Sequence, residues 1–145
     1  MGSLNVVVRV SRDLPFSCES CFEAWLTEAR ARRFFFASPS GVLQRIELDP
    51  RVGGAFTVVD RRDEEDVVHT GEYLVMERPR ALSFSFKVPA YSDDASTVAI
   101  TFEPLGASAC RVTLDAGAVP AEIHDRAVQG WSRVLERAEE SLRTP

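Results

Sequence analysis

Thiol and imidazole side chains are the first candidates for chemistry in this sequence, and they are few. Cys18 and Cys21 have the C-x-x-C spacing of redox motifs. That motif works within a βαβ unit, and the residues that follow do not predict one, so a redox role is not favoured. The remaining members are Cys110, His69 and His124, and no zinc-ligand spacing can be assembled from the five. The sequence therefore predicts neither a metal site nor a cofactor.

His124 is the titratable side chain whose position in a predicted helix suggests a role. It lies at a helical interval from Trp131, so it borders the apolar face near the start of that helix. It could supply a polar contact at a cavity mouth or act as a general acid or base, but a solvated or locally bonded histidine is the favoured interpretation. An enzyme would need more polar groups converging on one interior, and the other candidates are Tyr73, Glu72 and Arg51.

The densest group of carboxylates, Glu64-Glu65-Asp66, lies in a charged run over residues 61–66. The run has no apolar residue and is typical of a solvated hairpin tip. Such a tip cannot hold carboxylates in a dry, fixed geometry. Ser/His/Asp arrangements and nucleotide-binding glycine patterns are absent from the sequence, so it predicts no catalytic residues.

Charge and composition exclude several classes of partner. The 145 residues carry a net charge of −5 at pH 7, and an acidic field repels nucleic-acid phosphates and anionic lipid heads. No apolar run approaches the ~20 residues that cross a bilayer, and no signal peptide opens the chain. We therefore expect a cytoplasmic protein without nucleic-acid partners or membrane insertion. Its length predicts one domain, residues 1–145, and leaves the oligomeric state open.

The apolar periodicity changes along the chain and predicts an α+β fold. A strand over residues 5–12 precedes two short helical segments, the first opened by Ser17 as N-cap. From Val42 onward the period is two between turn signals, which predicts an antiparallel meander. After Pro120 a spacing of 3.6 predicts a long amphipathic helix. The meander strands are expected at residues 43–48, 55–60, 67–76, 82–86, 98–102 and 112–116, and the helical segments at 17–26, 28–36 and 120–142.

Glycines mark two places in these elements. Gly130 lies on the apolar stripe of the long helix, where glycine costs about 1 kcal/mol relative to alanine. A close approach of the helix backbone to a strand is the favoured explanation, and room beside Trp131 for a ligand or a bend is the alternative. Gly53-Gly54 indicates positive φ and a β-bulge rather than a phosphate site, because a strand follows it.

Five motifs carry a resemblance to a known family. They are Pro15 with Cys21-Phe22-Glu23-Ala24-Trp25, Asp49-Pro50-Arg51-Val52-Gly53-Gly54-Ala55-Phe56, Gly71-Glu72-Tyr73, Pro79-Arg80-Ala81-Leu82-Ser83-Phe84, and Gly130-Trp131 through Leu135. With the order of elements, they make the chain similar to the helix-grip, START-like (SRPBCC) superfamily. Within it, the chain resembles the AHSA1-like family, named for the activator of the Hsp90 ATPase.

The resemblance implies a helix-grip fold, in which a curved antiparallel β-sheet wraps around the long C-terminal helix and two short helices follow the first strand. Cys21 takes the place of an aliphatic residue of that family, which suggests a small core hydrophobe. The resemblance also implies a cavity between sheet and helix, with Arg51 and His124 as polar groups at its mouth. For any single residue, plain core packing is the alternative. The expected lining residues are Trp25, Phe34, Phe56, Val58, Tyr73, Phe84, Phe86, Ile100, Phe102, Trp131 and Val134.

Three functions follow from the resemblance, in order of preference. The first is a non-catalytic binding protein, stress-related in this family, that holds a small hydrophobic or amphipathic ligand in the cavity. The second is a co-chaperone-like module acting on an Hsp90-type ATPase, although 145 residues leave no room for the separate N-terminal domain of that activator. The third is a cyclase- or hydrolase-type enzyme of the superfamily.

Overall fold

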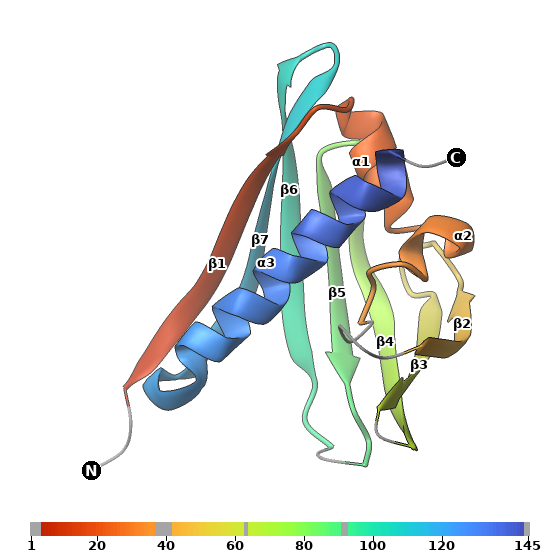
Figure 1. The fold of residues 1–145 in the computed structure, drawn as a ribbon, viewed down its shortest axis with the longest axis vertical. Coiled ribbons are helices and arrows are strands. Elements are labelled where there is room, and N and C mark those ends of the chain that lie inside the picture. The colour runs from red at the N-terminus through yellow and green to blue at the C-terminus, as the bar shows by residue number, and fades with distance from the viewer. Residues whose placement is uncertain (1–3, 37–41, 63, 91–92, 144–145) are drawn as a thin grey trace.

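Seven β-strands form one antiparallel sheet that curves around a long C-terminal helix (Figure 1). The computed structural model describes residues 4–36, 42–62, 64–90 and 93–143. The predicted α+β helix-grip fold is confirmed, with two short helices after the first strand. The elements are β1 (Asn5–Leu14), α1 (Cys18–Ala24), α2 (Glu28–Ala31), β2 (Val42–Leu48), β3 (Ala55–Arg62), β4 (Glu65–Glu77), β5 (Ala81–Lys87), β6 (Ser96–Gly106), β7 (Ala109–Pro120) and α3 (Ala121–Arg143).

The sheet order is β1-β7-β6-β5-β4-β3-β2, so β2 to β7 form a meander and β1 adds to β7. Alternation along each strand turns one face inward, and Leu82, Ile100 and Leu114 lie in register across three neighbouring strands with at most 1% exposure. Register shifts interrupt the pairings β1–β7, β2–β3, β4–β5 and β6–β7. Irregularities of this kind bend strands, as a sheet curved around a helix requires.

The two short helices bring aromatic side chains to the inner face of the sheet. The Ser17 side chain accepts a hydrogen bond from the Ser20 backbone N–H at 3.2 Å, which confirms the predicted N-cap of α1. Helix α2 has only four residues and turns follow it, so it is shorter than the predicted segment 28–36. Phe34 and Phe35 are buried next to each other in these turns, because packing of both rings into the core overrides a helical spacing.

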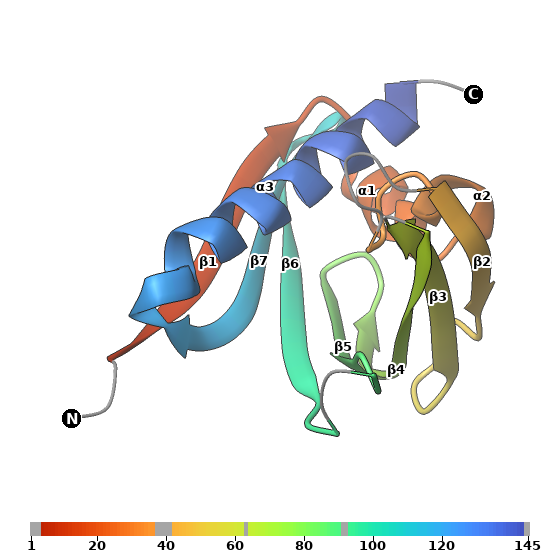
Figure 2. The ribbon, with the colours of Figure 1, turned by 60° about the horizontal axis from the view of Figure 1, so that its bottom comes forward.

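Helix α3 crosses the inner face of the sheet diagonally (Figures 1 and 2). Its N-terminal end lies beside β1, and its C-terminal end lies by α1 and α2. Burial follows this course, because the fully buried positions of α3 are confined to Leu135, Ala138, Glu139 and Ser141, near its C-terminal end. The elements therefore close tightly around one half of the helix.

Several strand ends differ from the predictions. Pro104-Leu105-Gly106, predicted as a turn, belongs to β6, which pairs with β7 through a register shift at that point. Strand β7 continues to Pro120, which pairs with Asn5, so α3 begins at Ala121. The charged run at residues 61–66 is largely paired, since Arg61 faces Asp66 across the hairpin. The predicted loop at Ser38-Pro39-Ser40-Gly41 and the turn at Ser92 lie outside the described residues.

Candidate functional site

Four rings meet between α3 and the sheet, one each from the turn after α2, β4, β5 and α3. We call Phe36, His69, Phe86 and Trp131 the aromatic quartet. Phe36 lies at its centre, stacked on His69 with ring centroids 4.5 Å apart and planes inclined by 12°. Phe36 also lies 4.9 Å from Phe86 and 6.1 Å from Trp131, and Phe86 lies 6.1 Å from Trp131. These separations are those of interacting aromatic pairs, so the quartet connects the helix to the sheet.

Strand register and backbone conformation place the quartet. His69 pairs with Val58, and Phe86 pairs with Gly71, so both side chains belong to the inward face. Gly71 permits this arrangement, because a Cβ there would overlap the Phe56 ring. Phe36 has a positive φ of 59°, which is uncommon for a bulky residue and turns its ring away from the direction set by α2.

The aromatic quartet lies where burial along α3 changes. Val128, Trp131 and Val134 are half-buried, whereas Leu135 is 2% exposed and Ile123 is 42% exposed. Gly130 is exposed, and a Cβ added to it would meet no atom within 4 Å. The favoured explanation of Gly130, a close approach to a strand, is therefore wrong. Space remains beside Trp131 on the apolar stripe of the helix.

The expected lining residues fall into two groups. Phe86, Trp131 and Val134 are half-buried at the aromatic quartet or next to it. The others are at most 3% exposed and contact one another through pairs such as Trp25–Phe34 at 4.9 Å and Phe56–Phe84 at 5.6 Å. Their lining role stays a prediction, and as placed they form a packed floor beneath the quartet. The buried group is Trp25, Phe34, Phe56, Val58, Tyr73, Phe84, Ile100 and Phe102.

Polar side chains also lie on the inward face, and the sequence reasoning missed two of them. Asp60 is fully buried and His69 is 5% exposed, on the adjacent strands β3 and β4. Each lies on the same strand face as a predicted inward residue, since Asp60 is two residues after Val58 and His69 is four before Tyr73, so the period of two was a usable signal for both. Phe36 was missed because its place depends on a backbone turn and not on a periodic pattern.

The Tyr73 hydroxyl is buried in the floor of the site. The residue is 1% exposed, and the hydroxyl has no hydrogen-bond partner within the described part of the chain. Burial raises the pKa of Tyr73, and the negative charges of Asp49 and Glu28 add to the effect. The phenol therefore stays protonated across the physiological range.

The polar candidates from the sequence do not converge. Arg51 is exposed and pairs with Asp49 at 2.9 Å, in the turn between β2 and β3. His124 Nε2 lies 3.0 Å from the Val7 carbonyl oxygen on β1, which is the opposite edge of the sheet. Glu72 alternates with Tyr73 and so belongs to the outward face. These positions do not assemble an acid–base pair around a common interior, and we derive no reaction from them.

A surface hollow of about 290 Å³ lies over the middle of β4 and the end of β5. Phe86 is its one residue in common with the expected cavity lining. Most of its other side chains point from the outward face of the sheet, so the hollow is a different site. Five of its eight lining residues are polar or charged, although most of the surface that they expose to it is apolar. Its lining residues are Thr70, Gly71, Glu72, Ser85, Phe86, Lys87, Asp93 and Ala95.

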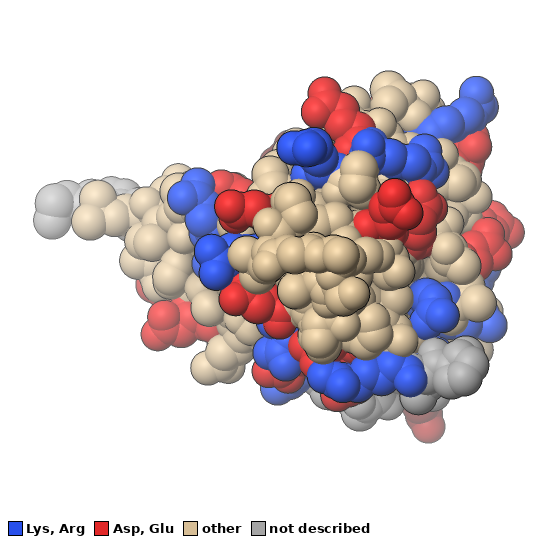
Figure 3. Space-filling view, turned by 90° about the horizontal axis from the view of Figure 1, so that it is seen from above, with Lys and Arg blue, Asp and Glu red and all other residues tan. Residues whose placement is uncertain are grey.

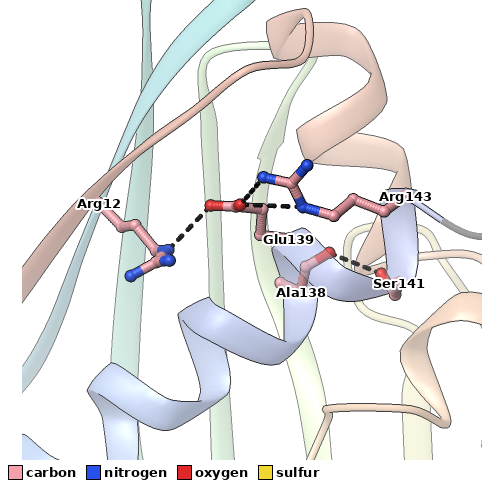
Figure 4. Close-up of polar contacts among 5 residues, drawn as sticks. All are labelled: Arg12, Ala138, Glu139, Ser141 and Arg143. Carbon is pink, nitrogen blue, oxygen red and sulfur yellow. Dashed lines mark hydrogen bonds and ion pairs between the residues drawn. The ribbon is translucent and has the colours of Figure 1, made fainter.

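A buried carboxylate fixes the C-terminal end of α3 (Figure 4). Glu139 is 8% exposed and accepts hydrogen bonds from Arg12 Nε at 3.0 Å and Arg143 Nε at 3.1 Å. Burial raises the pKa of Glu139, but the bonds from Arg143 and Arg12 outweigh it and leave the pKa below its usual value. Arg30 also donates to the Ser141 carbonyl, so α2 is tied to the same end.

Charges on the upper face of the molecule are mixed. Acidic and basic side chains alternate there around an uncharged centre (Figure 3). Exposed ion pairs join neighbouring elements, as between Arg78 and Glu23 at 2.7 Å and between Arg111 and Asp13 at 2.8 Å.

Among the described residues, no group of three or more His, Cys, Asp or Glu is arranged to hold a metal ion. Within the same ranges, no helix has the length and hydropathy needed to span a membrane.

Comparisons with known proteins agree with this architecture. Protein CV1439 from Chromobacterium violaceum is 20% identical, with a TM-score of 0.82 over 96% of this chain and 98% of its own. SA2116 from Staphylococcus aureus, a protein of unknown function, is also 20% identical, with a TM-score of 0.76 over 97% and 96% of the two chains. DynU16, from the dynemicin biosynthetic locus, is 21% identical with a TM-score of 0.72, and 95% of this chain matches 47% of that one. At these identities the likeness shows the fold alone.

No curated protein matches the sequence. The family model described as "Activator of Hsp90 ATPase homolog 1-like protein" matches residues 15–142, which include every described element after β1 except the last residue of α3. The resemblance seen in the sequence motifs is thus confirmed. The chain belongs to the family of activator of Hsp90 ATPase homolog 1-like proteins.

Proposed function

We propose that this protein binds a small hydrophobic or amphipathic molecule between the middle of α3 and the aromatic quartet. The observation that carries the proposal is the incomplete burial of apolar surface on both sides of that space. Trp131 and Phe86 are half-buried although they face each other from helix and sheet. A ligand that covered them would gain about 25 cal/mol for each Å² of apolar surface removed from water.

Gly130 supports the same location. It is on the apolar stripe of α3, next to Trp131, and a Cβ added to it would meet no atom of another element within 4 Å. A side chain at this position would occupy the space that we assign to the ligand. The absence of a side chain also exposes helix backbone, which costs stability unless another group covers it.

The surroundings of the quartet indicate the chemistry of the ligand. Flat rings such as Phe36 and Phe86 favour a molecule with a planar or extended apolar body. His69, stacked on Phe36, brings a polar ring to an otherwise apolar surface. A ligand with an apolar body and one hydrogen-bonding group would suit this combination of apolar rings and one polar ring. Small-molecule sites are commonly built in this way, mostly apolar with a few polar groups.

A thermal-shift screen with lipids, sterols and aromatic metabolites, together with mass spectrometry of the protein as purified and then denatured, tests the proposal. A ligand at 100 times its dissociation constant stabilises the folded state by about 2.7 kcal/mol, which a melting curve resolves. If no compound raises the melting temperature and none co-purifies, the proposal fails.

Two leucine variants locate the site once a ligand is found. Gly130→Leu fills the proposed space, and we expect it to weaken binding about tenfold or more. Gln129→Leu adds a leucine to the neighbouring exposed position and serves as the matched control, with unchanged affinity. Equal effects of the two variants would place the ligand elsewhere.

A role on an Hsp90-type chaperone is the second candidate, because the family description names activation of that ATPase. Leu74 and Val75 are 40% and 37% exposed on β4 and offer apolar contacts to a protein partner. The test is the ATPase rate of a purified Hsp90 with and without the full chain. An unchanged rate and no association in a pull-down would exclude this candidate.

A further inference from the structure

The chain has three cysteines, and the fold gathers all of them at one end of the sheet. Cys18 is the first residue of α1, Cys21 lies three residues further along that helix, and Cys110 is on β7 opposite Leu14 of β1. The Sγ atoms of Cys18 and Cys110 are 2.7 Å apart, although 92 residues separate them in sequence. Cys21 also hydrogen-bonds with Cys110, and its thiol lies 3.8 Å from the Phe16 carbonyl oxygen.

The three thiols differ in access to solvent. Cys110 is fully buried and Cys21 is 2% exposed, whereas Cys18 is half-buried. Burial raises the pKa of Cys21 to about 11 and also raises the pKa of Cys110, so both are protonated thiols at neutral pH. A soluble oxidant therefore reaches Cys18 first and meets the other two only through it.

We propose that Cys18 and Cys110 are a redox modification site, which a peroxide converts into a reversible disulfide between α1 and β7. The Cys18 sulfur attacks the peroxide, the O–O bond breaks, and Cys18 becomes a sulfenic acid with release of one water from hydrogen peroxide. The Cys110 sulfur then displaces the hydroxyl from Cys18, and its proton leaves with that hydroxyl as a second water. Two thiols and one peroxide thus give one disulfide and two waters.

Geometry favours this pairing over the C-x-x-C pair of the sequence. A disulfide bond is about 2.0 Å long, so the sulfurs of Cys18 and Cys110 need to move by less than about 1 Å. Cys21 lies on the buried side of the cluster, where its thiol is 3.8 Å from the Phe16 carbonyl oxygen. Cys18 is thus the exposed member, Cys110 is its partner, and Cys21 remains a thiol.

The bond would fasten α1 to the sheet. Helix α1 carries Phe22 into contact with Phe102 on β6, at a centroid distance of 5.2 Å, and Trp25 follows directly after the helix against Phe34. A cross-link across 92 residues also removes much of the freedom of the unfolded chain. We therefore expect the oxidised protein to melt higher than the reduced protein, by on the order of 5–10 °C.

The experiment uses the full chain, reduced and freed of reductant, then treated with hydrogen peroxide. After denaturation, N-ethylmaleimide labels the remaining thiols, and mass spectrometry of the intact and digested protein assigns them. We expect the number of labelled cysteines to fall from three to one. We also expect a peptide linking Cys18 to Cys110, labelled Cys21, a raised melting temperature, and complete reversal by dithiothreitol.

The variants Cys18→Ala and Cys21→Ala serve as a matched pair. Cys18→Ala changes a half-exposed position and should leave a folded protein that gains no stability from peroxide, whereas Cys21→Ala should still form the bond. The peptide map of the protein without substitutions identifies the linked cysteines, so it tests the proposal even if a variant folds poorly. A Cys18–Cys21 bond, a bond between two molecules, oxidation that stops at Cys18, or three labelled thiols after treatment would each overturn the proposal. None of these outcomes bears on ligand binding at the aromatic quartet.

Discussion

Gly130 and Tyr73 are two residues at which the usual local rules are not followed. A glycine in a helix interior and a buried hydroxyl without a protein partner both reduce stability. Both lie near the proposed ligand site, Gly130 beside the quartet and Tyr73 in the floor that it rests on. Residues that reduce stability are expected at positions where ligand binding, rather than folding, favours a particular amino acid.

Replacement of Gly130 by alanine should stabilise the free protein. A Cβ there has no atom within 4 Å, so the gain in helix propensity is not offset by a clash. We expect the free energy of unfolding to rise by about 0.5–1 kcal/mol, measured by urea denaturation. A loss of stability would show that the helix approaches another element at this point.

Replacement of Tyr73 by phenylalanine should leave the stability unchanged or raise it. The substitution removes a hydroxyl that is buried without a hydrogen-bond partner in the described ranges and keeps the ring. Urea denaturation of the variant measures the change. A loss of more than about 1 kcal/mol would reveal a partner for the hydroxyl.

At the scale of elements, α3 is buried more completely toward its C-terminal end, although contacts with β1 also hold its N-terminal end. Its C-terminal half carries the buried residues and the Arg12–Glu139–Arg143 contacts, while its N-terminal half keeps apolar side chains half-exposed. The helix therefore has a buried C-terminal end and a half-buried middle that a ligand could cover. Periodicity predicted the helix, but it did not reveal that only half of its apolar face is buried.

Stability should fall in acid through Glu139. Because the folded-state pKa of Glu139 lies below the unfolded value, its contribution is complete above the unfolded pKa and is lost as the pH falls through the folded pKa. Glu139→Gln should cost about 1–3 kcal/mol at pH 7 and reduce the acid sensitivity, measured by urea denaturation from pH 7 to pH 3.

The control for this prediction is Glu47→Gln. Glu47 pairs with Arg45, but both side chains are more than half exposed, at 60% and 57%. Solvent screens an exposed pair of this kind, so it contributes little to stability. If the two variants lose stability equally, burial does not strengthen the contacts of Glu139.

Alanine substitutions along α3 should show that its C-terminal half contributes more to stability than its N-terminal half. Leu135→Ala removes a side chain that is 2% exposed and should cost about 2–5 kcal/mol, whereas Ile123→Ala affects one that is 42% exposed and should cost under about 1 kcal/mol. Thermal or urea unfolding gives both values. Amide exchange should also be faster over residues 121–130 than over 131–143.

At the scale of the whole molecule, contacts distant in sequence join the first strand to the last. Strand β1 pairs with β7 from Asn5–Pro120 to Leu14–Cys110, across about a hundred residues of chain, while β3 and β4 form a hairpin. Closure of the long loop is costly before its contacts form, so local hairpins should precede the pairing of β1.

Folding kinetics can test this order. Val10→Ala on β1 and Val58→Ala on β3 each delete the same buried groups, at 7% and 0% exposure. We expect Val10→Ala to act mainly by speeding unfolding and Val58→Ala to slow folding as well, measured by stopped-flow chevron plots. If Val10→Ala slowed folding and Val58→Ala only sped unfolding, β1 would pair with the sheet early in folding.

The sequence predicted the architecture better than the site, for a physical reason. Alternation in strands and the 3.6-residue period of α3 are local signals, and a buried face must show them. The positions of Phe36, which follows an unusual turn, and of Cys110 beside Cys18 depend on tertiary contacts that no local pattern records. The proline-containing end of β6 was misread as a turn because a register shift accommodates it.

The pairing of β1 with β7 also constrains how this protein can fold during its synthesis. The ribosome makes β1 before β7 and α3, which are the neighbours of β1 in the folded molecule. Residues 5–14 must therefore wait, with unpaired backbone groups and three valines in a row, until residues 109–143 have been made. While residues 15–108 are being made, the nascent chain carries this unpaired, aggregation-prone strand, and in that period it depends most on protection from aggregation.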